Sequence, residues 1–474
     1  MISFSNTYAT LPSAFFSPIS DKNSFRPDLI VFNHSLASEL GIDLNELSDK
    51  KLAEYFSATD FMPGTGPVAM AYAGHQFGHF VPQLGDGRAM LLGEFLDKNC
   101  VRYDVHLKGS GRTFYSRRGD GRSAIGPVLR EFLLSESMQA LGIPTTRSLC
   151  AVRTGEMVQR EEMLPGAVLT RLARAHIRVG TFQFFAAKGD VENLNILTKY
   201  SIERLYPELK ETEDSVFKFW HAVCSRQVKL ISQWMSVGFI HGVMNTDNMS
   251  VSGETIDYGP CAFMDQFTFN KVFSSIDQNG RYSYGNQLQI AVWNFARLAE
   301  CLIPLMGEDE EKSKERLEAE LSVFQETMMK EYFTIMSKKL GIEFNVETVK
   351  SWNVFLERHQ LDFTLSYIDL ERILGNKKTF TDLETLEGFR EFSAQWKESL
   401  KDDSIALMKK CNPQTIPRNH MVEKVIRAAE AGDDQPFIIM VENIKKPFER
   451  LNDLTPYQLP PRAEETVHRT FCGT

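Results

Sequence analysis

Apolar and polar residues alternate over residues 101–108, and this spacing predicts a β-strand. One face of that strand carries Tyr103, Val105 and Leu107, and the other carries Arg102, Asp104, His106 and Lys108. The preceding stretch reads VPQL, then Gly-Asp-Gly at 85–87, then RAMLLGE, which predicts a hairpin with its turn at 85–87. Residues 149–153 and 167–172 predict further strands. This part of the chain is therefore expected to be rich in β-structure.

Helical patterns flank and follow these strands. A Gly- and Arg-rich segment, 109–126, leads into a predicted helix with Pro127 near its first turn and Gly142 at its end. Residues 214–238 predict a long helix, and 308–337 carry an apolar stripe at helical spacing. Residues 1–70 predict an irregular arm with one short helix in HSLASELGIDLNELSD.

The order of elements predicts an α+β fold in two lobes. Residues 1–184 are expected to form the arm and a β-rich N-lobe with one inserted helix, and 185–474 a larger helical C-lobe. That is the layout of a protein kinase, although a fold alone does not give a function.

Composition narrows the class of protein. The chain of 474 residues is 43% hydrophobic with a net charge of −9, which argues against a nucleic-acid-coating protein and fits an enzyme. We find no apolar run of about 18 residues and no targeting pattern, so we expect a cytoplasmic monomer with no membrane partner. The seven Cys form no C-x-x-C pair, which argues against a zinc site or a disulfide framework.

The most informative segment is 241–257, HGVMNTDNMSVSGETID. Kinase catalytic loops read H-x-D-x-x-x-x-N and are followed by a metal-binding Asp. His241 and Asn248 keep this spacing and Asp257 follows nine residues later, but Val243 stands where the catalytic base is expected. Asp247 is the nearest carboxylate and becomes the candidate base. This pattern predicts that Mg-nucleotide is bound and that something other than the γ-phosphate is transferred.

Asn248 and Asp257 supply the hard oxygen ligands that Mg²⁺ prefers. Taken singly, each residue also has a common structural role: an Asn often caps a helix, and an Asp often ends a strand. The complete set fits those structural uses poorly. His241 is expected to be a structural loop histidine.

Lys108 ends the predicted strand, and Glu131 lies 23 residues later on the predicted helix. A Lys at such a position reaches nucleotide phosphates, and a helical Glu holds it through an ion pair. The alternative is a solvated Lys and an exposed Glu, the usual fate of both residue types.

Three further groups predict phosphate contacts. Gly85, Gly87 and Arg88 form a glycine turn followed by a cation, which is also a common structural turn. Basic residues cluster in 108–122, where flexible backbone and guanidinium groups suit an anion, although an exposed basic loop is the alternative. Arg171 and Arg178 lie seven residues apart, so both would lie on one face if the segment is helical and could bind a triphosphate together. The alternative is that each forms a structural salt bridge.

Long strings in the chain resemble the selenoprotein O family, also called the YdiU family, of kinase-fold protein adenylyltransferases. The strings are NTYATLP, AGHQFGHFVPQLGDGRAMLLGE, HLKGSGRTFYSRRGDGRSAIGPVLREFLLSE, HGVMNTDNMSVSGETIDYGPCAFMD, IPRNHMVE and FCGT, together with 167–189. The resemblance implies that ATP lies flipped relative to ordinary kinases, with AMP passing to a protein Ser, Thr or Tyr hydroxyl and pyrophosphate leaving.

The resemblance also implies residue roles. Asp247 would be the base, Asn248 and Asp257 would hold Mg²⁺ or Mn²⁺, and Glu131 would orient Lys108. Nucleotide contacts would come from Gly85, Gly87, Arg88, Lys108, Asp120, Gly121, Arg171, Arg178 and Asp257. Cys472 matches the position where some members of the family carry selenocysteine, and a redox pair between Cys472 and Cys261 is a hypothesis.

Two other functions compete with AMP transfer. Ordinary γ-phosphoryl transfer by a protein kinase is disfavoured by Val243. A catalytically silent, ATP-binding pseudokinase scaffold is disfavoured because the chain keeps Asp247 with the other site residues, and a scaffold needs no base.

Overall fold

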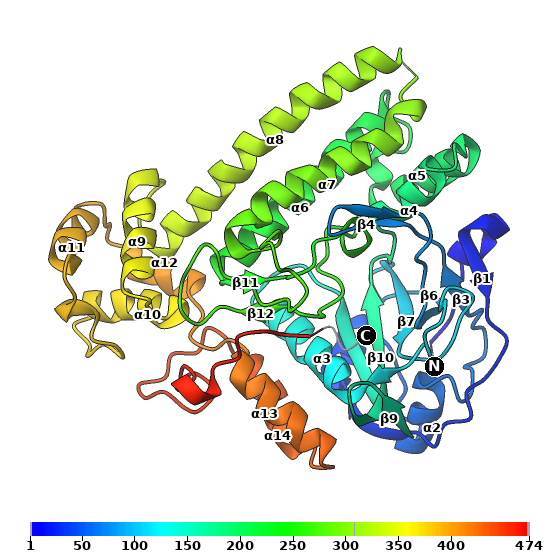
Figure 1. Ribbon diagram of the computed structural model, residues 1–474, viewed down its shortest axis with the longest axis horizontal. Coiled ribbons are helices and arrows are strands. Elements are labelled where there is room, and N and C mark those ends of the chain that lie inside the picture. The colour runs from blue at the N-terminus through cyan, green and yellow to red at the C-terminus, as the bar shows by residue number, and fades with distance from the viewer. Residues whose placement is uncertain (1, 308, 472–474) are drawn as a thin grey trace.

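The computed structural model describes residues 2–307 and 309–471, and an antiparallel sheet forms one end of it, at the right of Figure 1. The eight-stranded sheet has the order β1-β3-β6-β7-β10-β9-β2, with β8 pairing β10. Its strands are β1 (Phe16–Pro18), β2 (Asp28–Phe32), β3 (Val68–Met70), β6 (Ala89–Leu96), β7 (Arg102–Lys108), β8 (Ser123–Ala124), β9 (Arg147–Gln159) and β10 (Met163–Ala173). A helical region follows, so the expected α+β fold with a β-rich N-lobe is confirmed.

The hairpin predicted around 85–87 is wrong. β6 pairs with β7 and β3, and the strand before the glycine turn, β5 (His79–Val81), pairs instead with β4 (Gly74–Gln76) in a separate two-stranded sheet. Strand β6 instead forms a hairpin with β7. Its turn is closed by Asp97, whose Oδ1 accepts from the backbone N of Asn99 at 2.8 Å and of Val101 at 2.7 Å.

The predicted strand at 101–108 is confirmed as β7, and both of its faces are covered. Asp104 is 2% exposed and His106 is 0% exposed, so the polar face points into the protein and not into solvent. The predicted strands at 149–153 and 167–172 lie within β9 and β10.

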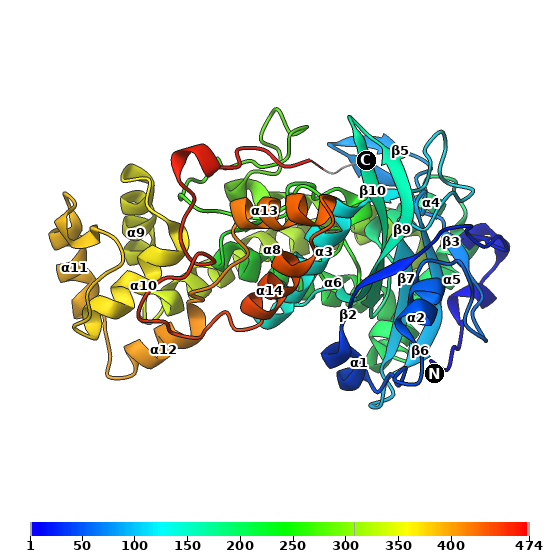
Figure 2. The same ribbon diagram turned by 90° about the horizontal axis from the view of Figure 1, so that it is seen from below.

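Helix α3 (Ile125–Ala140) packs beside β9 and β10 (Figure 2) and confirms the predicted inserted helix. It begins two residues before Pro127, which therefore lies in the first turn, where its missing N–H costs no hydrogen bond. Gly142, just past its end, has φ +76°, a conformation that suits glycine. The arm holds two helices, α1 (His34–Leu40) and α2 (Asp49–Phe56), and not the single one expected.

The C-terminal region is built on three long helices that pack together: α6 (Ser215–Ser236), α7 (Gln287–Leu302) and α8 (Glu310–Lys339). They confirm the helices predicted over 214–238 and 308–337. Trp220 of α6 packs edge-on against Phe324 of α8, with ring centroids 5.6 Å apart. The stretch Tyr284–Leu305 is long and apolar enough to span a membrane by length and composition, but 50% of its window is buried in the protein, as in a core helix.

The remaining helices extend to both sides of this bundle. Those after α8 are α9 (Val346–Arg358), α10 (Phe363–Leu374), α11 (Phe389–Glu398) and α12 (Ser404–Cys411), which lie far from the sheet in Figure 1, then α13 (Asn419–Glu430) and α14 (Gln435–Ile444). The last two return to cover α3 (Figure 2), with Phe437 packing on Phe132 at 5.7 Å. Helices α4 (Val179–Ala186) and α5 (Val191–Leu205) link the sheet to the bundle. The boundary between the N-lobe and the C-lobe at residues 184 and 185 stays a prediction.

Candidate active site

A cavity of about 940 Å³ lies between the sheet and the loop that carries residues 243–260. Each residue predicted to contact nucleotide or metal lines it: Gly85, Gly87, Arg88, Lys108, Asp120, Gly121, Arg171, Arg178, Asp247, Asn248 and Asp257. These residues come from segments up to 172 positions apart, counting from 85 to 257. The fold therefore brings the predicted set together, while the role of each residue stays a prediction.

Asp257 is the centre of an ion-pair cluster at one wall of the cavity. Its Oδ1 lies 2.8 Å from Lys108 Nζ and 2.6 Å from Arg171 Nη1. Glu131, on α3, pairs with the same two cations through Lys108 Nζ at 2.6 Å and Arg171 Nη1 at 3.1 Å. Arg178 approaches Asp257 from the other side, and its Nη1 pairs with Oδ2. The expected contact between Lys108 and Glu131 is thus present, and the alternative of two solvated side chains is wrong.

Arg171 and Arg178 do not share a helical face. Arg171 lies within β10, and Arg178 is the residue before the first turn of α4, with extended backbone. They converge because both guanidinium groups bind Asp257. Asp257 itself has φ +62°, a backbone conformation uncommon for residues other than glycine and often found at functional sites.

The cluster carries an excess of positive charge. Burial opposes ionisation of Asp257, but Arg171, Lys108 and Arg178 hold the pKa of its carboxyl well below the usual value. Three cations face two carboxylates, those of Glu131 and Asp257, which leaves a net charge of about +1. A buried site with this balance favours an anionic ligand such as phosphate.

Asp247 lies in a short 3₁₀ turn, η4 (Thr246–Asn248), on the same loop. Burial raises the pKa of its carboxyl to about 6, although the charge of Arg178 acts in the opposite direction. Oδ1 is buried and has no hydrogen-bond partner within the described residues, while Oδ2 accepts from Gln76 Nε2 at 3.4 Å. A carboxylate that lines the cavity and has a pKa near the working pH suits a general base.

Asn248 and Asp257 offer oxygen donors of the kind a Mg²⁺ ion takes. The Asn248 amide donates from Nδ2 to the carbonyl of Val243 at 3.0 Å, which leaves its oxygen as the atom available to a cation. Residues 2–307 and 309–471 hold no group of three or more His, Cys, Asp or Glu suited to a metal. Mg²⁺ commonly takes one or two oxygens from the protein, and substrate phosphates complete its coordination shell. The oxygens of Asn248 and Asp257 therefore fit such an ion.

Two glycine positions are needed for close packing around the cavity. A Cβ on Gly85, which has φ +69°, would lie 2.2 Å from Tyr115 Cγ, and a Cβ on Gly121, with φ +70°, would lie 2.2 Å from the carbonyl oxygen of Gly111. Asp120, beside Gly121, is engaged by Arg160 at 2.9 Å. The glycines therefore shape the wall of the cavity.

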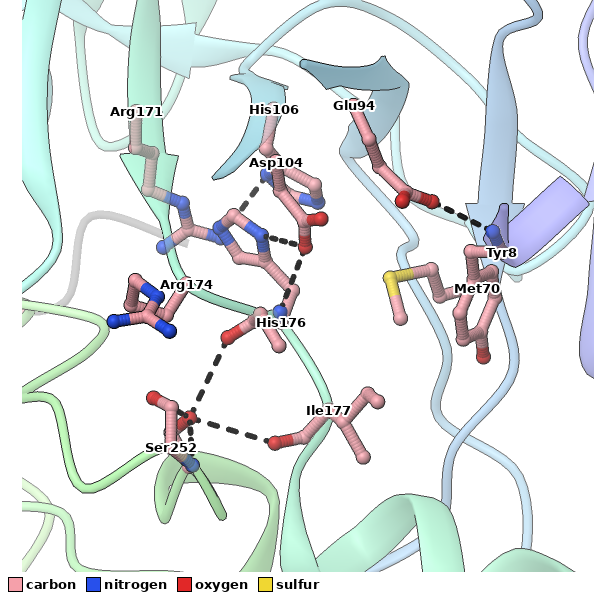
Figure 3. A network of polar contacts seen from close by, with 12 residues as sticks. Tyr8, Met70, Glu94, Asp104, His106, Arg171, Arg174, His176, Ile177 and Ser252 are labelled. Atoms are coloured by element: carbon pink, nitrogen blue, oxygen red, sulfur yellow. Dashed lines mark hydrogen bonds and ion pairs between the residues drawn. The ribbon is translucent and has the colours of Figure 1, made fainter. Parts of the chain in front are cut away.

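A buried layer behind Arg171 was not predicted (Figure 3). Arg171 Nη2 meets His106 Nδ1 at 3.3 Å, and His106 stacks on His176 with ring centroids 4.2 Å apart. Asp86 and Asp104 accept from these two rings, at 3.2 Å and 2.9 Å. Burial, together with the neighbouring His106, lowers the pKa of His176 to about 3. The polar face of 101–108 was the available signal, because Asp104 and His106 both lie on it.

His241 is buried, and its Nε2 lies 2.9 Å from the carbonyl oxygen of Ile256, which agrees with a structural loop histidine. Cys261 is also buried, and burial raises the pKa of its thiol to about 12, which disfavours the reactive thiolate. Cys472 lies outside the described residues, so the Cys261–Cys472 pair stays a hypothesis.

Comparisons with known proteins identify the family of this chain. A sequence model of the family described as "Protein adenylyltransferase SelO" matches residues 1–445. The chain is 50% identical over 487 residues to "Protein nucleotidyltransferase YdiU" of Agrobacterium fabrum, with 100% of each chain covered. It is 47% identical over 486 residues to the protein of the same name from Rhizobium etli, covering 99% of this chain and 97% of the relative. The chain therefore belongs to the protein adenylyltransferase SelO family.

Proposed function

We propose that this protein transfers AMP from ATP to hydroxyl groups of protein substrates and releases pyrophosphate. Membership of the adenylyltransferase family supports the reaction class. The observation that carries the proposal is the position of Asp247: its carboxylate lines the same cavity as a cluster of net positive charge.

The positive cluster binds the triphosphate. Lys108, Arg171 and Arg178 face the cavity and neutralise phosphate charge, and Glu131 keeps Lys108 and Arg171 in place. Asn248 and Asp257 are the residues that would hold Mg²⁺ or Mn²⁺, which when bound supplies further neutralisation of the phosphates. We expect the reaction to depend on one of these ions.

Asp247 accepts the proton of the acceptor hydroxyl. The hydroxyl oxygen forms a bond to the α-phosphorus, the bond from that phosphorus to pyrophosphate breaks, and the hydroxyl proton moves to the Asp247 carboxylate. Because its pKa is about 6, most of this carboxylate is ionised at pH 7 and is ready to take the proton. The guanidinium groups stabilise the negative charge that develops on pyrophosphate.

The structure gives no support to a base at the usual kinase position. Val243 occupies it, and an apolar side chain accepts no proton. Asp247 lies four residues further along the loop, so the acceptor is activated from a different place. This difference favours transfer of the AMP group over transfer of the γ-phosphoryl group.

Labelled ATP tests the proposal. Purified protein, a native protein extract and Mg²⁺ or Mn²⁺ are incubated with ATP labelled on the α- or on the γ-phosphate. We expect α-label in protein, dependence on the metal ion, and loss of labelling in Asp257→Ala but not in Asp60→Ala, a control at an exposed ion pair with Lys22 and Lys51. Incorporation of γ-label alone would make the protein a kinase, and no incorporation of either label would indicate a scaffold.

We also expect a cytoplasmic monomer that binds neither nucleic acid nor membrane. Light scattering of the purified protein and fractionation of the native cells test this expectation.

A further inference from the structure

The cavity has two sides with different chemistry. The side formed by loop 109–122 and by Arg160 carries most of its cations. A second part of the lining consists of apolar and amide side chains: Gln76, Phe77, Val243, Asn245, Pro260 and Ile276. Asp247 lies on this second side, in contact with Gln76. The side chains on this part of the lining are therefore mostly uncharged, although Arg178 donates to the backbone carbonyl of Asp247.

The β4–β5 hairpin reaches from the N-lobe onto the loop that carries Asp247. The backbone N of His75 donates to Thr246 Oγ1 at 2.7 Å, and that of Phe77 donates to Asn245 Oδ1 at 3.0 Å. A Cβ on Gly74 would lie 2.4 Å from Asp247 Oδ1, so the hairpin backbone is packed directly on the carboxylate. The hairpin and the candidate base thus pack together as one unit.

A second loop is fixed to the same unit. The Tyr282 hydroxyl donates to Asn245 Oδ1 at 2.6 Å, and its ring packs edge-on against Phe77 with centroids 5.2 Å apart. Ile276 lies on this loop and is 61% exposed, although it lines the cavity. Ile276 therefore offers an apolar contact at the edge of a cavity that is otherwise rich in cations.

We propose that Gln76, Phe77, Val243, Pro260 and Ile276 form an acceptor rim that binds the substrate polypeptide. The occupant is a segment in which an apolar residue neighbours the modified Ser, Thr or Tyr. Its apolar side chain packs on Ile276 and Phe77 while its hydroxyl reaches Asp247. This inference rests on the proposed function, because it assumes that a protein hydroxyl is the acceptor.

Charge complementarity decides which flanking residue fits. An acidic neighbour is attracted to the cationic side of the cavity, where it competes with the ATP phosphates. A basic neighbour finds no carboxylate among the described residues that line the rim, apart from Asp247 itself. An apolar neighbour is therefore the best fit, and we expect it to be preferred by about 10-fold.

A peptide library tests this preference. Each synthetic peptide holds one Ser, Thr or Tyr beside one randomised position, and transfer of α-labelled AMP is measured with wild type, Ile276→Asp and Ile276→Lys. Ile439→Asp is the matched control, because Ile439 is 50% exposed on α14, outside the rim. Both substitutions at Ile276 are at an exposed position, so folding is preserved.

We expect wild type and Ile439→Asp to favour apolar neighbours, Ile276→Asp to shift the preference to Lys and Arg, and Ile276→Lys to Asp and Glu. The same apolar preference in all four proteins would overturn the proposal of an acceptor rim. Labelling of extract proteins with no labelling of any peptide would also overturn it. Failure of the proposed function is distinguishable, because wild type would then transfer no α-label to the extract proteins either.

Discussion

Asp257 holds three cations in place before any ligand arrives, so its charge is predicted to stabilise the free protein. Asp257→Asn keeps the shape of the side chain and removes the charge. The cluster formed by Lys108, Arg171, Arg178, Glu131 and residue 257 then changes from a net charge of about +1 to about +2. We therefore expect the variant to be less stable when neither nucleotide nor metal is present.

The size of the effect follows from burial. Removing one partner of a buried ion pair costs about 3–5 kcal/mol, and the lower end applies here because the Asp257 side chain is 18% exposed. An unfolding entropy of about 2.1 cal/mol/K per residue gives about 1 kcal/mol/K for a chain of 474 residues. A loss of about 3 kcal/mol thus lowers Tm by about 3 °C.

Thermal unfolding measures this change. Asp60→Asn is the control, because Asp60 pairs with Lys22 and Lys51 at the surface and its loss is expected to cost less than about 1 kcal/mol. Tripolyphosphate without metal is expected to restore more of the Tm in Asp257→Asn than in wild type, since the variant site has more uncompensated positive charge. An apo variant as stable as wild type would refute the reasoning.

Three further predictions concern the walls of the site and the layer behind it. Gly121→Ala is expected to weaken ATP binding by about 10-fold or more, measured by ATP titration, because the new Cβ adds backbone strain and a clash. Gly142→Ala is the control: Gly142 also has a positive φ, +76°, but nothing lies within 4 Å of the new Cβ, so ATP affinity is expected to stay unchanged. Because the folded-state pKa of His176 is about 3 against about 6.5 unfolded, its contribution to stability is complete above pH of about 6.5 and is lost as the pH falls towards 3. Urea unfolding at several pH values measures how the free energy of unfolding rises with pH between about 3 and 6.5. We expect this rise to be smaller in His176→Gln than in wild type by up to about 1.4 kcal/mol per pH unit, and an equal rise in both proteins would contradict this pKa. Glu131→Gln is expected to raise KM for ATP, because Lys108 and Arg171 lose a shared partner, and steady-state kinetics with an unchanged KM would contradict that role.

The residues of the site were predictable because each lies in a short segment whose residue types and spacing indicate a catalytic or binding role. His241, Asn248 and Asp257 lie within one stretch, and Lys108 and Glu131 follow from the end of a strand and the helix after it. What brings these segments together is long-range pairing, such as β7 on β10 with Arg171 opposite His106. That register is not visible in local periodicity, and the layer of His106 and His176 was missed for this reason.

The errors have the same origin. Gly-Asp-Gly at 85–87 is typical of a hairpin turn, but β6 finds its partners in β7 and in β3, where Val68 lies opposite Leu91. The seven-residue spacing of Arg171 and Arg178 resembles a helical repeat, although strand β10 ends between them and helix α4 begins only after Arg178. No local pattern predicts that the β4–β5 hairpin packs on Asp247, because that contact joins residues 171 positions apart.

The most direct test of the account is the activity of Asp247→Asn. The asparagine keeps the size of the side chain and cannot accept the hydroxyl proton as a carboxylate does. We predict that AMP transfer falls by about 10²–10⁴-fold, while the dissociation constant for ATP, measured by calorimetry, stays within about twofold of wild type. Transfer at the wild-type rate by Asp247→Asn would contradict the assignment of this carboxylate as the base.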